Sequence, residues 1–396
     1  MSGSVFRDRG RLLPNFPIER YWGELPHRER QLKLLWNLYG DVLDRGGEAF
    51  LRVTQVIGPA GSGKTCTLRL FGSRFEEESR RQHIDLRHIY LNLKLEAGRK
   101  VVLYRTLLGK VDPSLVSASL SAEEMLRNLV KYLKENKRRI LLTVDEIDYY
   151  VRRFNEEGIV YDLTRLNELT PSEPCGIVGV TFLARDKGFH EFLDQGELST
   201  LGRLYIEFPP YNPAQIFDIL ERRAEDALRP GAYSTDVLEF IADVTARPPV
   251  NGDLRYALDL LLYSGRLADD EGADRILPEH VRRVHAESFH TVTTEDIEGL
   301  PDAERIALLA VARTLRFRKS PYASMREIRQ MVEALCEELR LKPIGDVEEL
   351  LQDLYDRGII DVKGPARIGI SGVALEDLDR FLKSLIARVG GSLVEP

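Results

Sequence analysis

One segment, VIGPAGSGKTCTLRL at residues 56–70, constrains the fold more than any other part of the chain. Residues 58–65 match the pattern G-x-x-x-x-G-K-[ST], with a short β-branched run before them and a helical pattern after them. Glycines let such a loop curl with its N–H groups pointing inward, and the positive end of the following helix favours negative charge. A chance turn with a structural lysine is the alternative, and the flanking strand and helix disfavour it. The segment therefore predicts a phosphate-binding loop in an α/β fold.

Each group in this loop has an expected role. Backbone N–H groups of residues 61–67 reach phosphate oxygens, Lys64 brings a positive charge to the β- and γ-phosphates, and Thr65 ligates Mg²⁺. We therefore expect the site to hold ATP or ADP together with Mg²⁺. The predicted nucleotide-binding residues of the loop are Gly58, Gly61, Ser62, Gly63, Lys64, Thr65, Cys66 and Thr67.

Residues from about 30 to 190 alternate between helical and strand-like patterns. The strand-like runs are FLRVTQVIG, HIYLNL, ILLTVDEID and GIVGVTFLA, followed by a shorter run, LYIEF. Their apolar residues occupy both faces, which is typical of parallel strands buried between two layers of helices. The prolines of FPPYNP, at residues 208–213, cannot continue a sheet and mark a boundary. The first part of the chain is thus predicted to be one α/β domain with a parallel sheet.

The run LLTVDEID supplies the second half of a nucleotide site. Asp145 ends a buried strand, where its carboxylate can orient Mg²⁺, and Glu146 beside it can polarise an attacking water. A D-E pair after an apolar run is weak by itself, because many such pairs are solvated strand ends. Its position about eighty residues beyond the phosphate loop strengthens the assignment. Asp145 and Glu146 are therefore predicted catalytic residues, with Asp145 and Thr65 as the metal ligands.

Beyond residue 213 the pattern becomes helical. Residues 213–288 are expected to form a small helical bundle, and HTVTTEDIEGLPD after it is expected to be a linker. From Asp302 three helical segments precede IIDVKGPARIGI, which reads as two short strands about a turn. Three helices and a β-hairpin are the winged-helix arrangement, a relative of helix-turn-helix. The expected domains are thus residues 1–205, 206–292 and 293–396.

Composition and the remaining motifs exclude several classes of protein. The longest apolar runs are far shorter than the roughly 20 residues that span a bilayer, and the N-terminal segment lacks the apolar core of a signal peptide. No CxxC pair or HExxH motif occurs, so neither a zinc site nor a disulfide framework is indicated. We expect a cytoplasmic protein associated with the nucleoid, without a membrane partner. The net charge of −7 means that any DNA binding must come from local basic patches.

Four features together resemble the AAA+ replication initiators of archaea: the phosphate loop, the DEID run, a Gly-Asp-x-Arg in the helical bundle and the C-terminal winged helix. These initiators are similar to the origin recognition and helicase-loading proteins of eukaryotes. The resemblance extends from about Leu25 to Gly369. It implies a P-loop AAA+ core with a parallel sheet, a helical lid domain and a C-terminal winged-helix domain.

The resemblance also implies roles for residues outside the phosphate loop. LPHRERQLKLLWNL is similar to the segment that lies beside the adenine in this family. IEFPPYNPAQIFDILERRA is the most specific match, and it implies that Tyr211 and Arg223 contact the nucleotide from the start of the lid. NGDLRYALDLL implies that Arg255 is the sensor-2 arginine, which reaches the γ-phosphate and counts among the catalytic residues. An ordinary surface charge on a helix is the alternative for Arg255.

Two stretches depart from the family pattern, and both concern hydrolysis. Phe182 stands where the family usually has an asparagine that orients the hydrolytic water, and Thr181 beside it is a partial substitute. GELSTLGR occupies the stretch where related proteins often carry an arginine finger. Gly196 and Thr200 stand there, and Arg203 is the arginine that remains nearby. Because an arginine finger accelerates hydrolysis by orders of magnitude, we expect a weak ATPase that acts as a slow ATP/ADP switch.

Basic residues in two regions are candidates for phosphate contacts to DNA. Residues 95–126 form an extra stretch, and an inserted helix at this place contacts DNA in the family. In the winged helix, residues 343–349 should begin the recognition helix but include adjacent glutamates, which repel phosphates, so the prediction moves to the wing and to RTLRFRK. Solvated basic faces are the alternative in both regions. The predicted DNA-binding residues are Arg99, Lys100, Arg105 and Lys110 in the insertion, and Arg316, Arg318, Lys363 and Arg367 in the winged helix.

These features leave two functions open. The first is an ATP-dependent initiator that binds double-stranded origin DNA, acts with other initiators and helps to load the replicative helicase. The second is an ATP-regulated adaptor or transcriptional regulator, and the acidic start of the expected recognition helix favours it. A ring-forming AAA+ motor is disfavoured by the missing arginine finger.

Overall fold

The computed structural model of the chain describes residues 3–17, 23–44, 50–96, 98–117, 119–154, 157–170, 173–289 and 292–389. It divides into two compact units. Residues 17–211 form the sheet unit, and residues 1–16 together with 212–396 form the helical unit. Within the described ranges, every helix is too short or too polar to cross a membrane.

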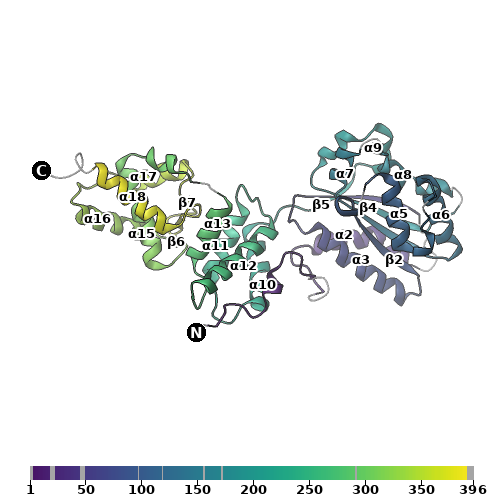
Figure 1. Cartoon of the computed structure of the whole chain (residues 1–396), viewed down its shortest axis with the longest axis horizontal. Helices are drawn as coiled ribbons and strands as arrows, with labels where there is room; N and C mark the ends of the chain where they lie inside the picture. The colour runs from purple at the N-terminus through teal and green to yellow at the C-terminus, as the bar shows by residue number, and fades with distance from the viewer. Residues whose placement is uncertain are drawn as a thin grey trace. The chain divides into compact units, whose positions relative to one another are not determined.

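A five-stranded sheet forms the centre of the sheet unit (Figure 1). Its strands are β1 (Arg52–Ile57), β2 (Leu86–Asn92), β3 (Arg139–Asp145), β4 (Ile177–Ala184) and β5 (Tyr205–Glu207). They occur in the order β2-β3-β4-β1-β5, and every neighbouring pair is parallel, as the apolar runs predicted. The carboxyl ends of β1, β3 and β4 therefore lie next to one another at one edge, where the phosphate loop, Glu146 and the residue after Ala184 follow them.

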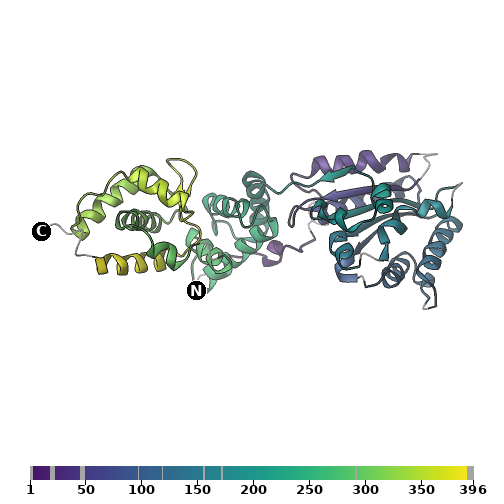
Figure 2. The same ribbon diagram turned by 90° about the horizontal axis from the view of Figure 1, so that it is seen from above.

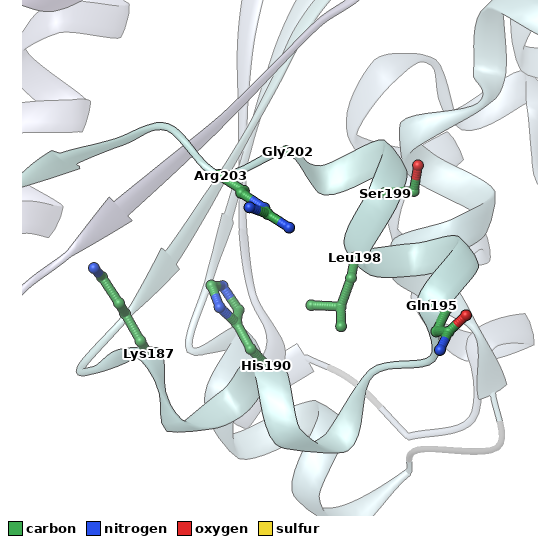
Figure 3. Close-up of a pocket in the computed structure, with 7 residues that line it drawn as sticks. All are labelled: Lys187, His190, Gln195, Leu198, Ser199, Gly202 and Arg203. Atoms are coloured by element: carbon green, nitrogen blue, oxygen red, sulfur yellow. The ribbon is translucent and has the colours of Figure 1, made fainter.

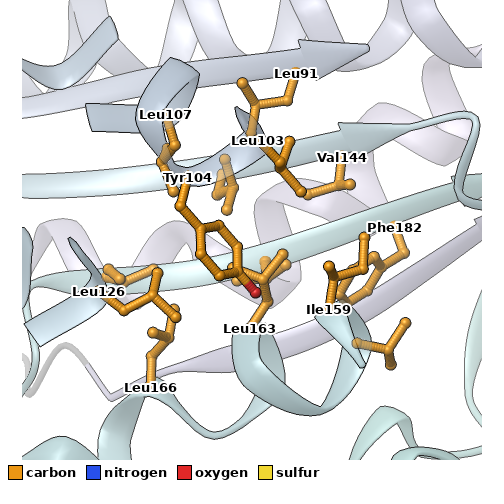
Figure 4. Packing of buried hydrophobic residues seen from close by; sticks show 14 of the residues in the cluster. Leu91, Leu103, Tyr104, Leu107, Leu126, Val144, Ile159, Leu163, Leu166 and Phe182 are labelled. Atoms are coloured by element: carbon orange, nitrogen blue, oxygen red, sulfur yellow. The ribbon is translucent and has the colours of Figure 1, made fainter. Parts of the chain in front are cut away.

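Helices cover both faces of this sheet. They are α2 (Glu29–Tyr39), α3 (Lys64–Arg81), α4 (Leu93–Glu96), α5 (Lys100–Val111), α6 (Ala122–Glu135), α7 (Ile147–Arg153), α8 (Ile159–Thr164) and α9 (Gln195–Leu201). On one face α2 and α3 pack through Leu35 and Phe71, and on the other the core includes Leu103 of α5 (Figure 4). Because successive strand residues point to opposite faces, Phe182 belongs to the second core and Leu183 to the first.

The helical unit begins with the bundle that the pattern predicted. Its helices are α10 (Pro213–Ala227), α11 (Thr235–Ala246), α12 (Leu254–Asp270) and α13 (Pro278–Ser288). Residues 3–16 pack on this bundle: Phe6 forms a β-bridge with Leu228, and the N–H of Arg7 donates to the carbonyl of Ala227 (2.8 Å). The sequence pattern gave no sign of this packing, because the segment is short and has no clear periodicity.

The winged-helix domain contains the predicted three helices and hairpin, together with further elements (Figure 2). Its elements are α14 (Thr294–Glu298), α15 (Asp302–Arg318), β6 (Tyr322–Ala323), α16 (Met325–Leu339), α17 (Val347–Asp356), β7 (Asp361–Val362), β8 (Ile368–Gly369) and α18 (Leu375–Val389). The strands form an antiparallel sheet in the order β6-β8-β7. The expected linker after residue 289 was wrong in part, because it contains α14, whose Ile297 is buried in this core with Leu300. His290 and Thr291 lie outside the described residues.

Polar side chains determine where several helices begin. Before α6, the hydroxyl of Ser121 accepts from the N–H of Glu124, and the carboxylate of Glu124 accepts from the N–H of Ser121. Ser324 and Glu327 form the same reciprocal pair before α16. Asn212 caps α10 in a similar way. Such caps stabilise a helix by about 1 kcal/mol, because they satisfy N–H groups that have no partner inside the helix.

Candidate functional site

The phosphate loop leaves β1 at the carboxyl edge of the sheet and leads directly into α3. Gly61 and Gly63 have φ angles of +66° and +84°, a region that glycine adopts at little cost. A Cβ at Gly63 would also lie 2.6 Å from the hydroxyl of Tyr211. Because α3 begins at Lys64 without a side-chain cap, the first N–H groups of the helix have no acceptor within it. These donors fit the phosphate group that the motif predicts.

Lys64, which should meet the β- and γ-phosphates, lies folded over the loop. Its Nζ donates to the carbonyl of Gly58 (2.6 Å) and to that of Pro59 (2.9 Å). A Cβ at Gly58 would lie 2.1 Å from the carbonyl oxygen of Phe208, so the loop needs glycine there. Binding of a phosphate requires the ammonium group to exchange these neutral carbonyls for charged oxygens, which form stronger hydrogen bonds.

Asp145 is the most heavily hydrogen-bonded carboxylate of the site. Its Oδ2 accepts from the hydroxyl of Thr65 (2.7 Å) and from that of Tyr90 (2.6 Å), and its Oδ1 accepts from the N–H of Glu146 (2.8 Å). Burial and the neighbouring Asp145 raise the pKa of Tyr90. Thr65 and Asp145, the predicted metal ligands, are thus brought together, and a hydroxyl with one carboxylate suits the protein's share of a Mg²⁺ site. Sequence reasoning missed Tyr90, which lies two residues before the end of β2.

Glu146 follows β3 in a left-handed backbone conformation (φ +60°, ψ +40°), which is uncommon for a residue with a side chain. Its Oε2 accepts from Nη2 of Arg185 (3.2 Å), the first residue after β4. The Nε of the same guanidinium group lies 3.9 Å from Oδ2 of Asp148. Burial, and then the charge of Glu146, raise the pKa of Asp148. The predicted catalytic carboxylate is therefore held in an ion pair that sequence reasoning did not foresee.

Phe182, near the end of β4, faces the core of the sheet unit and not the nucleotide site. Its side chain is 1% exposed and packs in the second core, where Figure 4 shows it near Ile159 of α8 and Val144 of β3. The idea that Thr181 substitutes in part was wrong, because Thr181 is fully buried and its hydroxyl lies 3.0 Å from the hydroxyl of Tyr39, on the other face of the sheet. Arg185 is the polar side chain that β4 does bring to Glu146, one residue beyond the end of the strand.

Tyr211 adjoins the phosphate loop at Gly63, and its contact with a nucleotide stays a prediction. Its ring lies 3.8 Å from the guanidinium carbon of Arg28, and burial raises its pKa to about 12. Arg28 is 2% exposed and donates to the carbonyls of Ser62 and Pro209, at 2.9 Å each. This arginine links the loop to the strand-end segment before the lid. Sequence reasoning quoted the segment that contains Arg28 but did not single out the residue.

Arg223 and Arg255 belong to the helical unit, so their contact with a nucleotide stays a prediction. Arg223 is 3% exposed; its Nη2 donates to the carbonyl of Leu13 (2.7 Å), and its guanidinium lies 5.3 Å from the ring centre of Phe16. Arg255 is exposed in the first turn of α12, where its N–H donates to Asp253 (2.9 Å). The Gly-Asp of the motif therefore acts as a cap that starts α12 and presents Arg255 to solvent.

The segment expected to carry an arginine finger consists of α9 and the turn after it. Thr200 points inward, where its hydroxyl accepts from that of Thr164 (2.8 Å). Arg203 lines a cavity of about 750 Å³ together with Lys187 and His190 from the segment after β4 (Figure 3). Burial, and then the charge of Lys187, lower the pKa of His190. Arg203 thus faces a cavity within the sheet unit.

The four basic residues of the insertion lie at the start of α5 or along it. Lys100 pairs with Glu123 (3.1 Å), and Lys110 pairs with Glu96 (2.6 Å). The Nε of Arg105 is buried and has no hydrogen-bond acceptor among the described residues. Arg99 is exposed just before the helix. Their contact with DNA stays a prediction.

The four basic residues predicted for DNA in the winged helix each have an acidic neighbour. Arg316 lies 3.5 Å from Glu376, and Arg318 pairs with Glu327. Lys363 and Arg367 of the wing pair with acidic residues of α11 instead. The expected recognition helix, α17, carries Glu348 and Glu349 in its first turn, as the sequence indicated. The positive charge available to a partner at each of these four positions therefore depends on whether the ion pair there opens.

Models of three protein families match successive parts of the chain. An AAA domain model matches residues 52–191. A Cdc6 AAA+ ATPase-type lid domain model matches residues 217–286, and a CDC6 C-terminal winged helix domain model matches residues 295–371. Their order is the order of the sheet, the helical bundle and the winged helix described above.

Curated relatives are similar to the chain over most of its length. The ORC1-type DNA replication protein of Pyrococcus abyssi is 30% identical over 345 residues, which are 86% of this chain and 80% of that protein. ORC1-type DNA replication protein 1 of Aeropyrum pernix is 32% identical over 317 residues, which are 78% of this chain and 76% of that protein.

Solved structures agree with these relatives. Cdc6p from Pyrobaculum aerophilum superposes with a TM-score of 0.83 at 27% identity, covering 98% of this chain and 100% of that one. The Aeropyrum pernix ORC1 protein in complex with DNA has a TM-score of 0.61 at 27% identity, with the same coverage. The fold, the phosphate loop with its Thr65–Asp145 pair, and the similarity to these proteins along most of the chain lead to one conclusion: the chain belongs to the archaeal ORC1/Cdc6-type family of AAA+ DNA replication initiators.

Proposed function

We propose that this chain is an ATP-controlled initiator that recognises double-stranded origin DNA, acts with other initiators and helps to load a replicative helicase. The observation that carries the proposal is the hydrogen bond from Thr65 to Asp145 (2.7 Å) beside the phosphate loop, in a chain that also has a winged helix. A related protein, Aeropyrum pernix ORC1, has been solved in complex with DNA, which supports DNA as the partner.

The residues of the site divide the work on the nucleotide. The loop amides and Lys64 hold the phosphates, while Thr65 and Asp145 would hold Mg²⁺, whose charge would stabilise the negative oxygens of the triphosphate. Glu146 accepts a proton from the attacking water. Hydrolysis is slow, because β4 provides no asparagine and the carboxylate of Glu146 is paired with Arg185. ATP and ADP then define two long-lived states of a weak ATPase.

The nucleotide half of the proposal is tested by binding and turnover of ATP. Lys64→Ala should lose most nucleotide affinity, because it removes the charge that meets the phosphates. Glu146→Gln should keep ATP affinity and lower the hydrolysis rate by about 100-fold, the usual contribution of a general base. Rapid unassisted turnover by the unmodified chain, or full activity of Glu146→Gln, would contradict the switch.

The DNA half is tested by footprinting and filter binding on origin DNA with ATP and with ADP. The proposal expects protection of discrete origin sites and affinity that falls steeply with salt, because phosphate contacts release counterions. Helicase loading is tested separately, by co-sedimentation of the purified helicase with the chain on origin DNA. If the chain binds origin DNA but recruits no helicase, its function is limited to marking the origin.

An ATP-regulated adaptor or transcriptional regulator is the second candidate, and α17 favours it. The first turn of this helix is acidic, and Glu348 pairs with Arg329 of α16. Such a surface repels phosphates and suits a basic protein partner. Footprinting on promoter and origin DNA side by side separates the two functions: protection confined to promoters would support the regulator.

A further inference from the structure

The wing, residues 361–369, is docked on an acidic stripe of α11 within the helical unit. Glu239 and Asp243 are four residues apart, so they lie on the same side of this helix. Lys363 pairs with Asp243, and Arg367 lies 2.7 Å from Glu239 and 3.5 Å from Asp243. The two cations of the wing that the sequence predicted for DNA are therefore the same two that the acidic stripe holds.

Asp243 is the centre of this docking surface. It is 6% exposed, and it also accepts a hydrogen bond from the hydroxyl of Tyr322 on β6. The guanidinium of Arg367 lies 4.6 Å from the ring centre of Tyr322, so the aromatic ring and the carboxylates hold this arginine together. Burial, and then the charge of Asp243, raise the pKa of Tyr322. A buried carboxylate with two cations and a hydroxyl is a specific contact and not a chance meeting of surface charges.

A second set of contacts keeps the two domains together without using the wing cations. Arg282 of α13 is 1% exposed, and it donates from Nε to the carbonyl of Ile370 (2.7 Å) and from Nη2 to that of Pro321 (3.1 Å). The N–H of Leu375 donates to the carboxylate of Glu279 (2.8 Å). Ile370 directly follows the wing, and Leu375 begins α18. The pairs with Glu239 and Asp243 can therefore open while the winged helix stays attached to the lid.

We infer that the acidic stripe of α11 is a docking surface for the wing and competes with DNA phosphates for Lys363 and Arg367. The inference rests on the proposed DNA binding. A carboxylate and a phosphate oxygen accept from the same ammonium and guanidinium donors, so one cation cannot serve both fully. DNA must displace Glu239 and Asp243, and the docked wing lowers the affinity of the whole chain for duplex DNA.

The test measures affinity of the full chain for a fluorescent duplex of mixed sequence at constant salt. The Glu239→Gln/Asp243→Asn variant should bind about fivefold more tightly, the effect expected when ion pairs of this kind no longer compete. Asp236→Asn is the charge-matched control for the single Glu239→Gln variant described below, because Asp236 is exposed on the same helix and each change removes one negative charge. It should leave the affinity within about twofold. Equal tightening by the control would overturn the inference and assign the effect to net charge.

Two further variants separate the inference from the function on which it rests. Lys363→Gln/Arg367→Gln should weaken DNA binding, and adding the two acid-to-amide changes to it should give no recovery. If Lys363→Gln/Arg367→Gln weakens DNA binding but Glu239→Gln/Asp243→Asn alone brings no gain in affinity, the competition is rejected and the wing remains a DNA contact. Unchanged binding by Lys363→Gln/Arg367→Gln would reject the wing as a DNA contact and the inference with it.

Glu239→Gln alone guards against misfolding, because Asp243 is buried whereas the side chain of Glu239 is 39% exposed. It removes the carboxylate that lies 2.7 Å from Arg367 and should keep the thermal stability of the chain. Its affinity for the duplex should fall between those of the unmodified chain and the double variant. No gain in affinity from a stably folded Glu239→Gln variant would count against the competition.

Discussion

At the scale of single residues, the site departs from its family pattern where β4 ends. The strand continues to Ala184, which pairs in register with Ile57 at the end of β1. Phe182 therefore lies two residues inside the strand, facing the core, and not at the mouth of the site. The position that carries an asparagine in the family has become a packing position. The polar role at this edge passes to Arg185, which lies just beyond the strand.

Restoring the family residue at position 182 should therefore damage the protein instead of activating it. Phe182→Asn removes a ring from a filled core and buries an amide, which should cost about 3 kcal/mol or more in the free energy of unfolding. Urea denaturation measures this loss. Phe182→Leu, which keeps an apolar side chain, should cost clearly less. An asparagine variant that is stable and hydrolyses ATP faster would show that the strand end can rearrange toward the family geometry.

The pair between Arg185 and Glu146 gives a second prediction at this scale. The carboxylate of Glu146 accepts a hydrogen bond from Arg185, which occupies a lone pair that could accept the proton of the water. Arg185→Ala should therefore raise the rate of single-turnover hydrolysis about two- to fivefold without changing ATP affinity, because the free energy of a half-exposed ion pair corresponds to a factor of this size. Rapid-quench measurement with excess protein gives the rate. Arg185→Lys should restore the slow rate.

Arg152→Ala is the matched control for this prediction, since Arg152 lies in the same region and pairs with Asp186 (3.8 Å). It should leave the rate unchanged. A slower reaction in Arg185→Ala, with ATP affinity intact, would mean that the guanidinium assists the chemistry and does not restrain Glu146.

At the scale of elements, the packing of α3 on β2 contains a titratable group. A Cβ at Gly72 would lie 1.9 Å from Nδ1 of His88, so the helix approaches the strand closely at this ring. The Nε2 of His88 lies 2.8 Å from the hydroxyl of Thr143. Burial, and then the charge of Arg69, lower the pKa of His88 to about 4. The packing thus requires the neutral imidazole.

This packing should make the sheet unit sensitive to acid. The unfolded chain binds a proton at His88 below about pH 6.5, whereas the native protein resists it until about pH 4. The contribution of neutral His88 to the free energy of unfolding is therefore fully present above about pH 6.5. It is lost as the pH falls, by about 2 kcal/mol between pH 7 and pH 5. His88→Gln should remove this part of the loss, as measured by urea unfolding at both pH values. Parallel pH profiles for the variant and the unmodified chain would contradict it.

At the scale of the whole molecule, the sequence predicted what depends on local pattern. The phosphate loop, the parallel strands and Asp145 follow from spacing and hydrophobic runs, and the structure brings Thr65 and Asp145 together as expected. Arg28, Tyr90 and Arg185 could not be found in this way, because their partners lie 34 to 181 residues away along the chain. Their roles depend on which strands are neighbours in the sheet. The docking of the wing on α11 is of the same kind, since it joins segments that no local pattern connects.

The coupling between nucleotide and DNA gives the last prediction. If the bound nucleotide sets the affinity for DNA, the chain should bind duplex DNA with affinities that differ about fivefold or more between ATP and ADP. Arg255→Ala should abolish that difference, because the exposed arginine at the start of α12 is the group expected to distinguish the γ-phosphate. Arg266→Ala, on the same helix and also exposed, is the matched control and should keep the difference. Since the wing cations are unchanged in both variants, affinity without nucleotide should stay the same; a nucleotide effect that survives Arg255→Ala would place the sensor elsewhere.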